Sequence, residues 1–178
     1  MNEDEDKALV RQCRAGDRQA FEALVRRYQK PVYNAALRLL HDPEDARDVA
    51  QTAFLKAYEH LADYEPGYKF YSWLYRIAIN EALNVLSSRK PRSESADEAD
   101  ESPGPEQRAE GEQMSRAIEL ALQELKPELR TVIVLRHFMQ LSYQDMGEIL
   151  TLPEKTVKSR LFSARQLLRE QLAHQGIS

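Results

Sequence analysis

The sequence predicts an all-α protein in which two small helical domains are joined by a flexible acidic linker. Apolar residues recur at spacings of three and four, and no stretch shows the period-two alternation of a half-buried strand. The segment 91–115 is rich in acidic residues, proline and serine and almost lacks large apolar side chains. The length of 178 residues suits one or two small domains. We therefore expect domains over 1–90 and 116–178, with 91–115 as the linker.

The charge distribution supports this division. Residues 1–90 hold 14 basic and 14 acidic side chains, 91–115 hold 2 and 8, and 116–178 hold 9 and 7, which gives nets of 0, −6 and +2. A segment with the composition of residues 91–115 cannot bury enough apolar surface to offset the conformational entropy that it would lose on folding. The total charge of −4 argues at first against a nucleic-acid partner, but the linker alone accounts for that deficit.

Composition also excludes several classes of protein. No apolar run approaches the 20 or so residues of a membrane span, and the acidic start Met1–Lys7 lacks the features of a secretory signal. The single Cys13 cannot form an internal disulfide, which suits a reducing cytoplasm. The chain has no glycine-rich phosphate loop and no histidine pair at metal spacing, so we expect no enzyme activity, catalytic residues, metal or cofactor.

Two long helices are expected in the second half of the N-terminal domain. Asp42 is a suitable N-cap, and Pro43 with the acidic residues after it is typical of a first turn, so a helix is predicted over 43–61. Pro66 and Gly67 break the chain. A second long helix then follows over Phe70–Ser88.

The sequence of the C-terminal domain predicts a helix-turn-helix. Pro127 begins a helix that extends to about Phe138, and Ser142 with Asp145 resembles a capping box that begins a short helix to Leu150. Residues 151–153 separate that short helix from a last one over 153–173. A short helix, a tight turn and a long basic helix are the layout of this DNA-binding motif.

The last helix has an unusual outer face. Its predicted buried stripe is formed by Val157, Leu161, Ala164, Leu168 and Leu172, and the opposite face carries Lys155, Ser159, Phe162 and Gln166. Residues 154–169 contain five basic side chains and one acid. A solvated amphipathic helix is the alternative, but Phe162 lies far from the apolar stripe. We therefore expect DNA contact, with basic groups on phosphates and Ser159 and Phe162 at base edges.

Two further surfaces carry exposed apolar groups. On the helix 43–61, Leu55 lies opposite the predicted buried side, beside Asp48, Gln51, Thr52 and Tyr58, which suits either a protein-docking surface or a solvated face. Between residues 64 and 84, aromatic rings lie beside a polar stripe, which suits the capture of unstacked bases, although about half of the rings are expected in the core. These side chains are Tyr64, Tyr68, Phe70, Tyr71, Trp73, Tyr75, Arg76, Asn80 and Asn84.

Several long motifs, in order, resemble a bacterial RNA polymerase sigma factor of the extracytoplasmic-function type, closest to the envelope-stress branch. The resemblance covers nearly all of the chain except the linker and the extreme termini. The motifs are DRQAF at 17–21, DARDVAQTAFLKAY at 45–58, FYSWLYRIAIN at 70–80, LRTVIVLR at 129–136, LSYQDM at 141–146 and TVKSRLF at 156–162.

This resemblance implies three sets of site residues. Docking on core RNA polymerase falls to Asp45, Asp48, Gln51, Thr52, Phe54, Leu55 and Tyr58. Recognition and melting of the −10 promoter element falls to Tyr64, Tyr68, Lys69, Phe70, Tyr71, Trp73, Arg76, Asn80 and Asn84. Recognition of the −35 element falls to Lys155, Thr156, Lys158, Ser159, Arg160, Phe162, Ser163 and Arg165. The implied partners are core RNA polymerase, promoter DNA and an anti-sigma factor, without membrane insertion.

Two other functions explain part of the sequence. An autonomous helix-turn-helix repressor or activator would account for the C-terminal domain but not for the aromatic cluster. A protein-binding adaptor would account for Leu55 and the acidic linker but not for the face around Phe162.

Overall fold

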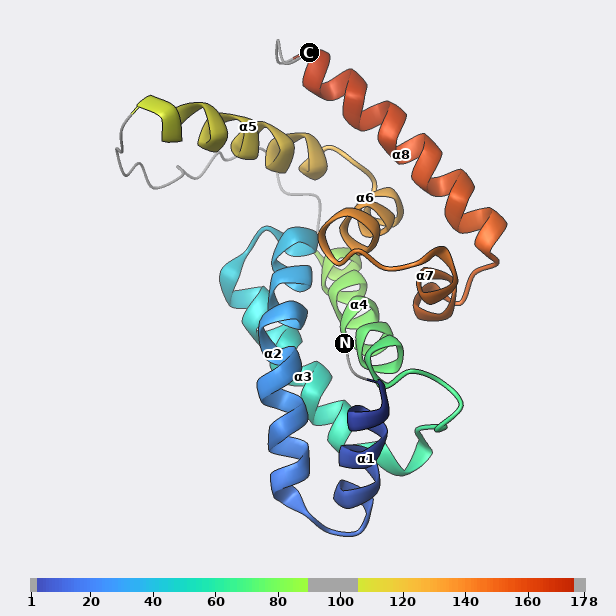
Figure 1. Cartoon of the computed structure of the whole chain (residues 1–178). Coiled ribbons are helices and arrows are strands. Elements are labelled where there is room, and N and C mark those ends of the chain that lie inside the picture. The colour runs from blue at the N-terminus through green and yellow to red at the C-terminus, as the bar shows by residue number, and fades with distance from the viewer. Residues whose placement is uncertain (1–2, 90–105, 175–178) are drawn as a thin grey trace.

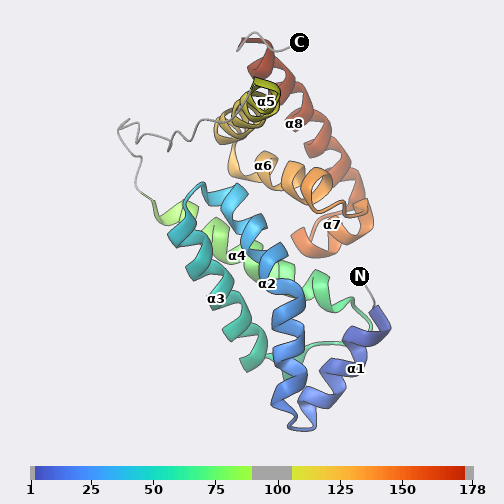
Figure 2. The ribbon, with the colours of Figure 1, turned by 60° about the vertical axis from the view of Figure 1, so that its left-hand side comes forward.

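The computed structural model describes residues 3–89 and 106–174, and within these ranges the chain is helical with no strand. The N-terminal domain lies below and the C-terminal domain above in Figures 1 and 2. The all-α, two-domain prediction is confirmed. The N-terminal domain consists of α1 (Glu3–Arg14), α2 (Arg18–Leu40), α3 (Pro43–Glu59), the 3₁₀ helix η1 (Leu61–Asp63) and α4 (Phe70–Ser88).

The core of the N-terminal domain lies among α2, α3 and α4. Small side chains on α3, such as Ala46, Ala53 and Ala57, are fully buried, so that α3 approaches its neighbours closely. Tyr28 of α2 and Phe70 of α4 fill the centre. The helix α1 packs across α2, with Val10 buried beneath it.

The C-terminal domain consists of α5 (Glu106–Gln123), α6 (Pro127–Ile133), the π-helical turn η2 (Val134–Phe138), α7 (Tyr143–Leu150) and α8 (Glu154–His174). The buried side of α8 is formed by Val157, Leu161 and Ala164, which pack against α6 and α7. Leu168 and Leu172, the other two members of the predicted stripe, are partly buried. The short helix, turn and long helix of the predicted helix-turn-helix are therefore all present.

The predicted start signals lie where the helices begin. Asp42 accepts hydrogen bonds from the amides of Glu44 and Asp45 at 2.9 Å each, and Ser142 accepts one from the amide of Asp145 at 3.1 Å. The helix predicted over 43–61 ends at Glu59, and α4 has the predicted bounds.

The predicted linker differs from the structure at its C-terminal end. Residues 91–105 lie outside the described residues, whereas α5 begins at Glu106, within the predicted segment. Composition missed this start because residues 106–112 have no large apolar side chain, and small and polar residues that favour helices also occur in solvated linkers.

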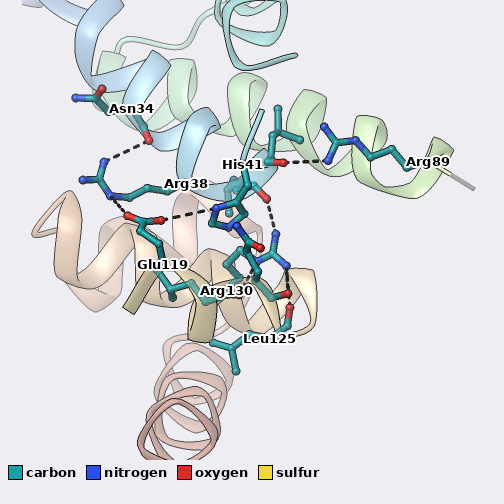
Figure 3. A network of polar contacts seen from close by, with 11 residues as sticks. Asn34, Arg38, His41, Arg89, Glu119, Leu125 and Arg130 are labelled. Atoms are coloured by element: carbon teal, nitrogen blue, oxygen red, sulfur yellow. Dashed lines mark hydrogen bonds and ion pairs between the residues drawn. The ribbon is translucent and has the colours of Figure 1, made fainter. Parts of the chain in front are cut away.

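Arg130 joins the two domains at the end of α2. Its guanidinium donates to the carbonyl of Leu39 at 2.5 Å and to those of Leu122, Gln123 and Leu125 at 2.7–3.1 Å. Figure 3 shows this cation between the ends of α2 and α5. Leu39, Leu122 and Gln123 lie in the last turns of α2 and α5, where carbonyls lack their helical partner, and Leu125 follows α5, so one buried cation binds two helix ends from different domains.

A second cation and a carboxylate complete this junction. Arg89 donates to the carbonyl of Leu40 at 2.9 Å and pairs with Asp45. Glu119 of α5 lies 3.7 Å from Nδ1 of His41 and 3.9 Å from Nε of Arg38 (Figure 3). Burial, together with the charges of Arg130 and Arg89, lowers the pKa of His41 to about 4. His41 is therefore neutral near pH 7, and Glu119 faces it across the domain boundary.

A search of the described ranges for a long apolar helix finds none that could cross a membrane. The same part of the chain holds no group of three His, Cys, Asp or Glu side chains arranged for a metal ion.

Candidate nucleic-acid and protein interfaces

The outer face of α8 is open to solvent. Phe162 is 66% exposed, although it is a large apolar side chain, and it lies opposite the buried Val157, Leu161 and Ala164. The predicted −35 residues Lys155, Lys158, Ser159, Ser163 and Arg165 are also exposed, and Thr156 and Arg160 are partly buried. All eight predicted residues thus lie on one helix, and none belongs to its fully buried stripe.

The basic groups on this face have only weak local partners. Lys158 lies 3.3 Å from Glu154, one turn away, and 5.2 Å from the centre of the Tyr143 ring. Arg165 donates to the imidazole of His137 at 3.2 Å. Exposed pairs of this kind contribute at most about 1 kcal/mol, so phosphate groups could displace them.

The turn before α8 depends on Gly147. A β-carbon added at Gly147 would lie 2.8 Å from the carbonyl oxygen of Leu152, so this position admits no side chain without a shift of the backbone. The carbonyl of Gly147 accepts a hydrogen bond from the amide of Leu152 at 2.9 Å. Thr151 adopts the left-handed conformation, with φ 55°, and ends α7. This close approach fixes the direction in which α8 leaves the turn.

The outer face of α3 presents apolar and polar groups together. Leu55 is 56% and Tyr58 is 46% exposed, and Asp48 and Gln51 lie on the same open side. The remaining three predicted core-docking residues are less accessible. Phe54 is buried, Thr52 is partly buried, and Asp45 pairs with Arg89.

A groove of about 560 Å³ lies between α2 and α3, next to this face. Phe54 and Gln51 reach it from α3, so the buried Phe54 is still accessible through the groove. The sequence did not indicate the α2 side of the groove, since those residues share no motif. They are Val25, Gln29, Lys30 and Tyr33.

The predicted −10 residues divide into a buried and an exposed set. Tyr64, Phe70 and Tyr71 are 1–7% exposed. Lys69, Trp73 and Arg76 are partly exposed, and Tyr68, Asn80 and Asn84 are exposed. About half of the rings were expected in the core, and the structure buries four of the six: Tyr64, Phe70, Tyr71 and Tyr75. Tyr64, Phe70 and Tyr75, together with Tyr28 and the partly exposed Trp73, form one chain of ring contacts with centroids 5.4–6.4 Å apart.

Two of the partly exposed residues contact the other domain. Lys69 pairs with Asp145 of α7 at 2.8 Å, and Arg76 donates to the backbone carbonyl of Glu148 at 2.9 Å. Burial opposes ionisation of Asp145, but hydrogen bonds from Lys69, Ser142 and Tyr71 hold its pKa below the ordinary value. The helix α7 therefore lies over the start of α4, as Figure 1 shows.

A pocket of about 250 Å³ remains at this contact. Tyr68, Trp73 and Arg76 line it from the N-terminal domain, and Glu148 lines it from α7. Ser72 is 2% exposed, lines the same pocket, and its hydroxyl has no hydrogen-bond partner. The sequence did not indicate that Asp145 and Glu148 would lie here, because their elements are separated by more than 70 residues.

Two family profiles match the chain. The family described as Sigma-70 region 2 matches residues 24–92, and Sigma-70, region 4 matches residues 115–168. Together these matches cover the three faces described above, with the acidic segment between them.

Full-length relatives are similar over nearly the whole chain. The RNA polymerase sigma-H factor of Pseudomonas aeruginosa is 35% identical over 185 residues, which span 97% of this chain and 96% of that protein. The ECF RNA polymerase sigma-E factor of Escherichia coli K12 is 38% identical over 176 residues, which span 92% of each chain.

Solved structures have the same arrangement of helices. The structure of CnrH in complex with the cytosolic domain of CnrY superposes with a TM-score of 0.76 at 27% identity, over 96% of this chain and 98% of that one. The sigma factor RpoE in complex with the anti-sigma factor NepR from Bartonella quintana gives a TM-score of 0.66 at 24% identity, over 86% and 96% of the two chains. The second likeness concerns the fold alone.

Proposed function

Because the chain belongs to the sigma-70 family, as a sigma factor of the extracytoplasmic-function type, we propose that its three exposed faces divide the work of transcription initiation among them. A sigma factor binds core RNA polymerase and promoter DNA. The single observation that supports the division best is the open face of α8. It places an exposed Phe162 among hydroxyl and basic groups, opposite a buried stripe.

The outer face of α8 reads the −35 element in the major groove. Serine hydroxyls can bond either a donor or an acceptor on a base edge, and an aromatic ring can contact a thymine methyl. Ser159, Phe162 and Ser163 therefore contribute base preference. Lys155, Lys158 and Arg165 contact phosphates, which position the helix without selecting a sequence.

The loop 64–69 and the exposed side of α4 capture the −10 element. Tyr68 and Trp73 offer ring faces to unstacked bases, and Asn80 and Asn84 offer amides that can read a base edge. Lys69 and Arg76 contact the strand once α7 has left them. The buried Tyr64, Phe70 and Tyr71 form the frame that holds these groups.

Strand opening at the −10 element requires core RNA polymerase. Unstacking four base-pair steps costs roughly 6 kcal/mol at about 1.4 kcal/mol per step. A stacked base returns only about 1–3 kcal/mol, and this surface offers one exposed ring, Tyr68, and one partly exposed ring, Trp73. The chain alone therefore cannot keep a bubble open.

The outer face of α3 and the groove beside it dock on core RNA polymerase. Leu55 and Tyr58 form the apolar centre of this surface, with Asp48 and Gln51 at its edge, and Phe54 and Thr52 contribute from beneath. Asp45 contributes through its pair with Arg89, which fixes the end of α4 against the start of α3.

Three further assignments follow from this function. The chain acts as an initiation factor and not as an enzyme. It works in the cytoplasm, where its polymerase and promoters are. An anti-sigma factor is its expected partner, as the resemblance to extracytoplasmic-function sigma factors implies.

Run-off transcription with core RNA polymerase and a promoter library tests the proposal on α8. We expect Ser159→Ala and Phe162→Ala to change the preferred −35 sequence, because a base contact is worth about 1–3 kcal/mol of discrimination. Lys158→Ala should weaken binding to all sequences alike and reduce the salt slope by about 0.9. Equal losses on specific and scrambled −35 sites for all three variants would refute this division of roles. A wild-type chain that directs no initiation with core enzyme would refute the function itself.

A further inference from the structure

We infer that Arg14, at the end of α1, is a positioning residue that sets the shape of the −10 recognition loop. The inference rests on the proposed function of the loop 64–69. The helix α1 lies outside the residues 24–92 that match Sigma-70 region 2. The observations that carry it are the contacts of one side chain with a segment 47–50 residues away.

The guanidinium of Arg14 binds three backbone carbonyls in η1 and at the first residue of the loop 64–69. Its Nε and one Nη donate to the carbonyl of Leu61 at 3.0 and 2.9 Å. The same Nη donates to the carbonyl of Ala62 at 2.9 Å and also to that of Tyr64. The carbonyls of Leu61 and Ala62 lie in η1 and that of Tyr64 directly follows it, and the Leu61 carbonyl also accepts from the Tyr64 amide at 3.3 Å. Arg14 therefore adds charged donors at the end of η1 and fixes the direction in which the chain enters the loop 64–69.

The contact extends from the backbone to the rings of the loop. The guanidinium of Arg14 lies 5.8 Å from the centre of the Tyr64 ring, and Tyr64 is 2% exposed. The Tyr64 hydroxyl donates to the carbonyl of Tyr68, and its ring packs 5.4 Å from that of Trp73. Arg14 thus acts through Tyr64 on Tyr68 and Trp73, the two rings proposed to meet unstacked bases.

The helix that carries Arg14 is itself firmly held. Asp6 is fully buried, accepts a hydrogen bond from the Tyr28 hydroxyl and pairs with Arg27 at 2.5 Å. Val10 is 2% exposed beneath the same helix. The turn to α2 is tight, and Gly16 has φ 99°, a backbone conformation that residues other than glycine rarely adopt. A rigid support of this kind is what a side chain needs in order to fix a loop.

A planar guanidinium suits this task better than an ammonium group. Its fork of fixed donors can reach several carbonyls at once, whereas a lysine offers a point charge on a flexible stem. Arg14→Lys should therefore restore only part of the function that Arg14→Gln removes. A merely structural contribution to stability would not produce this order in base selectivity.

The test compares Arg14→Gln and Arg14→Lys with Arg11→Gln, the matched change at another exposed arginine of the same helix. With core RNA polymerase, the ratio of transcription from matched and mismatched −10 sequences should fall about tenfold in Arg14→Gln, because hydrogen bonds from a charged donor are lost. Arg14→Lys should give an intermediate ratio. Affinity for core enzyme and the −35 preference should remain those of the wild type.

A second readout follows the loop without DNA. Trp73 is the single tryptophan of the chain, so quenching of its fluorescence by acrylamide reports how well the loop is packed. Quenching should increase in Arg14→Gln and stay unchanged in Arg11→Gln. Unchanged quenching and unchanged −10 selectivity in Arg14→Gln would overturn the inference. A parallel loss of core affinity would also overturn it, since α1 would then support the whole domain.

The two readouts separate this inference from the proposed function. If the wild type itself does not discriminate between −10 sequences, the proposed function of the loop fails, and the quenching of Trp73 still decides whether Arg14 holds the loop. If the wild type discriminates and Arg14→Gln does so equally well, only the role of Arg14 fails.

Discussion

At the domain junction, the charged side chain of Arg130 lies buried between two helix ends. The sequence pattern predicts these helix ends but not the buried charge. Arg130 is 7% exposed and bonds four carbonyls, and burial is the main cause that lowers its pKa. A buried cation is tolerated when it is fully hydrogen-bonded. His41 beside it adopts a left-handed conformation, with φ 53°, and its pKa is about 4. His41 is therefore neutral near pH 7 at this junction.

The pH dependence of unfolding tests the role of His41. The pKa in the folded chain, about 4, lies below the ordinary 6.5, so the unfolded chain binds the extra proton between these values. The His41 contribution to stability is thus present above pH 6.5 and is lost as the pH falls towards 4. The groups that face the imidazole are Glu119, Arg130, Arg89 and Arg38.

His41→Asn removes this titration and keeps a residue type that tolerates the left-handed conformation. When the pH is lowered from about 6.5 to about 5, we expect the free energy of unfolding to fall in the wild type and to fall less in the variant. The difference between the two losses should be on the order of 1 kcal/mol. Chemical denaturation at several pH values measures the difference. His174→Asn, at the exposed end of α8, is the control. Identical slopes for the wild type and His41→Asn would contradict the prediction.

The helices α7 and α8 are joined by a turn that packs so closely on α7 that Gly147 of this helix has no room for a side chain. The sequence predicted the two helices from their capping and breaking signals, but it gave no indication that the carbonyl of Leu152 would come so close to the middle of α7. The turn residue Thr151 is β-branched and adopts the left-handed region, which costs such residues about 1–2 kcal/mol. Packing therefore holds the turn in a backbone conformation that Thr151 by itself disfavours.

Gly147→Ala tests this close approach. The added methyl would lie 2.8 Å from a backbone oxygen that cannot rotate away, so α7 and the turn must separate. We expect a loss of about 1–3 kcal/mol in the free energy of unfolding, the usual range for overpacking, and weaker binding to a −35 duplex. Thermal unfolding and duplex titration measure the two effects.

Gly67→Ala is the matched control, because a β-carbon at Gly67 meets nothing within 4 Å. If the two alanine variants unfold at the same temperature, the turn is more adaptable than the structure indicates.

At the scale of the whole molecule, the two domains lie closed on each other. Lys69 and Arg76, both assigned to the −10 element, bind α7 through Asp145 and the carbonyl of Glu148. Figure 2 shows the C-terminal domain resting on the N-terminal one. Because we propose that the same two cations contact promoter DNA, we expect −10 binding to require that the domains separate.

Asp145→Asn should favour that separation, because it removes the charge that pairs with Lys69. We expect the free variant to bind a single-stranded −10 oligonucleotide several-fold more tightly than the wild type, with a larger radius of gyration in solution scattering. Fluorescence anisotropy measures the affinity.

Ser142→Ala controls for damage to α7 itself. It removes the N-cap of that helix and the hydrogen bond from the Ser142 hydroxyl to Asp145, and it leaves the Asp145 carboxylate opposite Lys69. An equal gain in both variants would show that loosening of α7, and not the ion pair, controls access to the −10 surface.

The sequence by itself determined the helical fold, the capping residues, the helix-turn-helix and the exposed faces around Leu55 and Phe162. Each of these is a local property, since the period of apolar residues and the first turn of a helix lie within a few neighbouring positions. Only the tertiary structure decided which aromatic rings are buried, that Arg14 binds the carbonyl of Leu61, 47 residues away, and that Asp145 faces Lys69. These contacts join segments that lie far apart along the chain. No periodic pattern in the sequence relates such segments, so only tertiary packing brings them together.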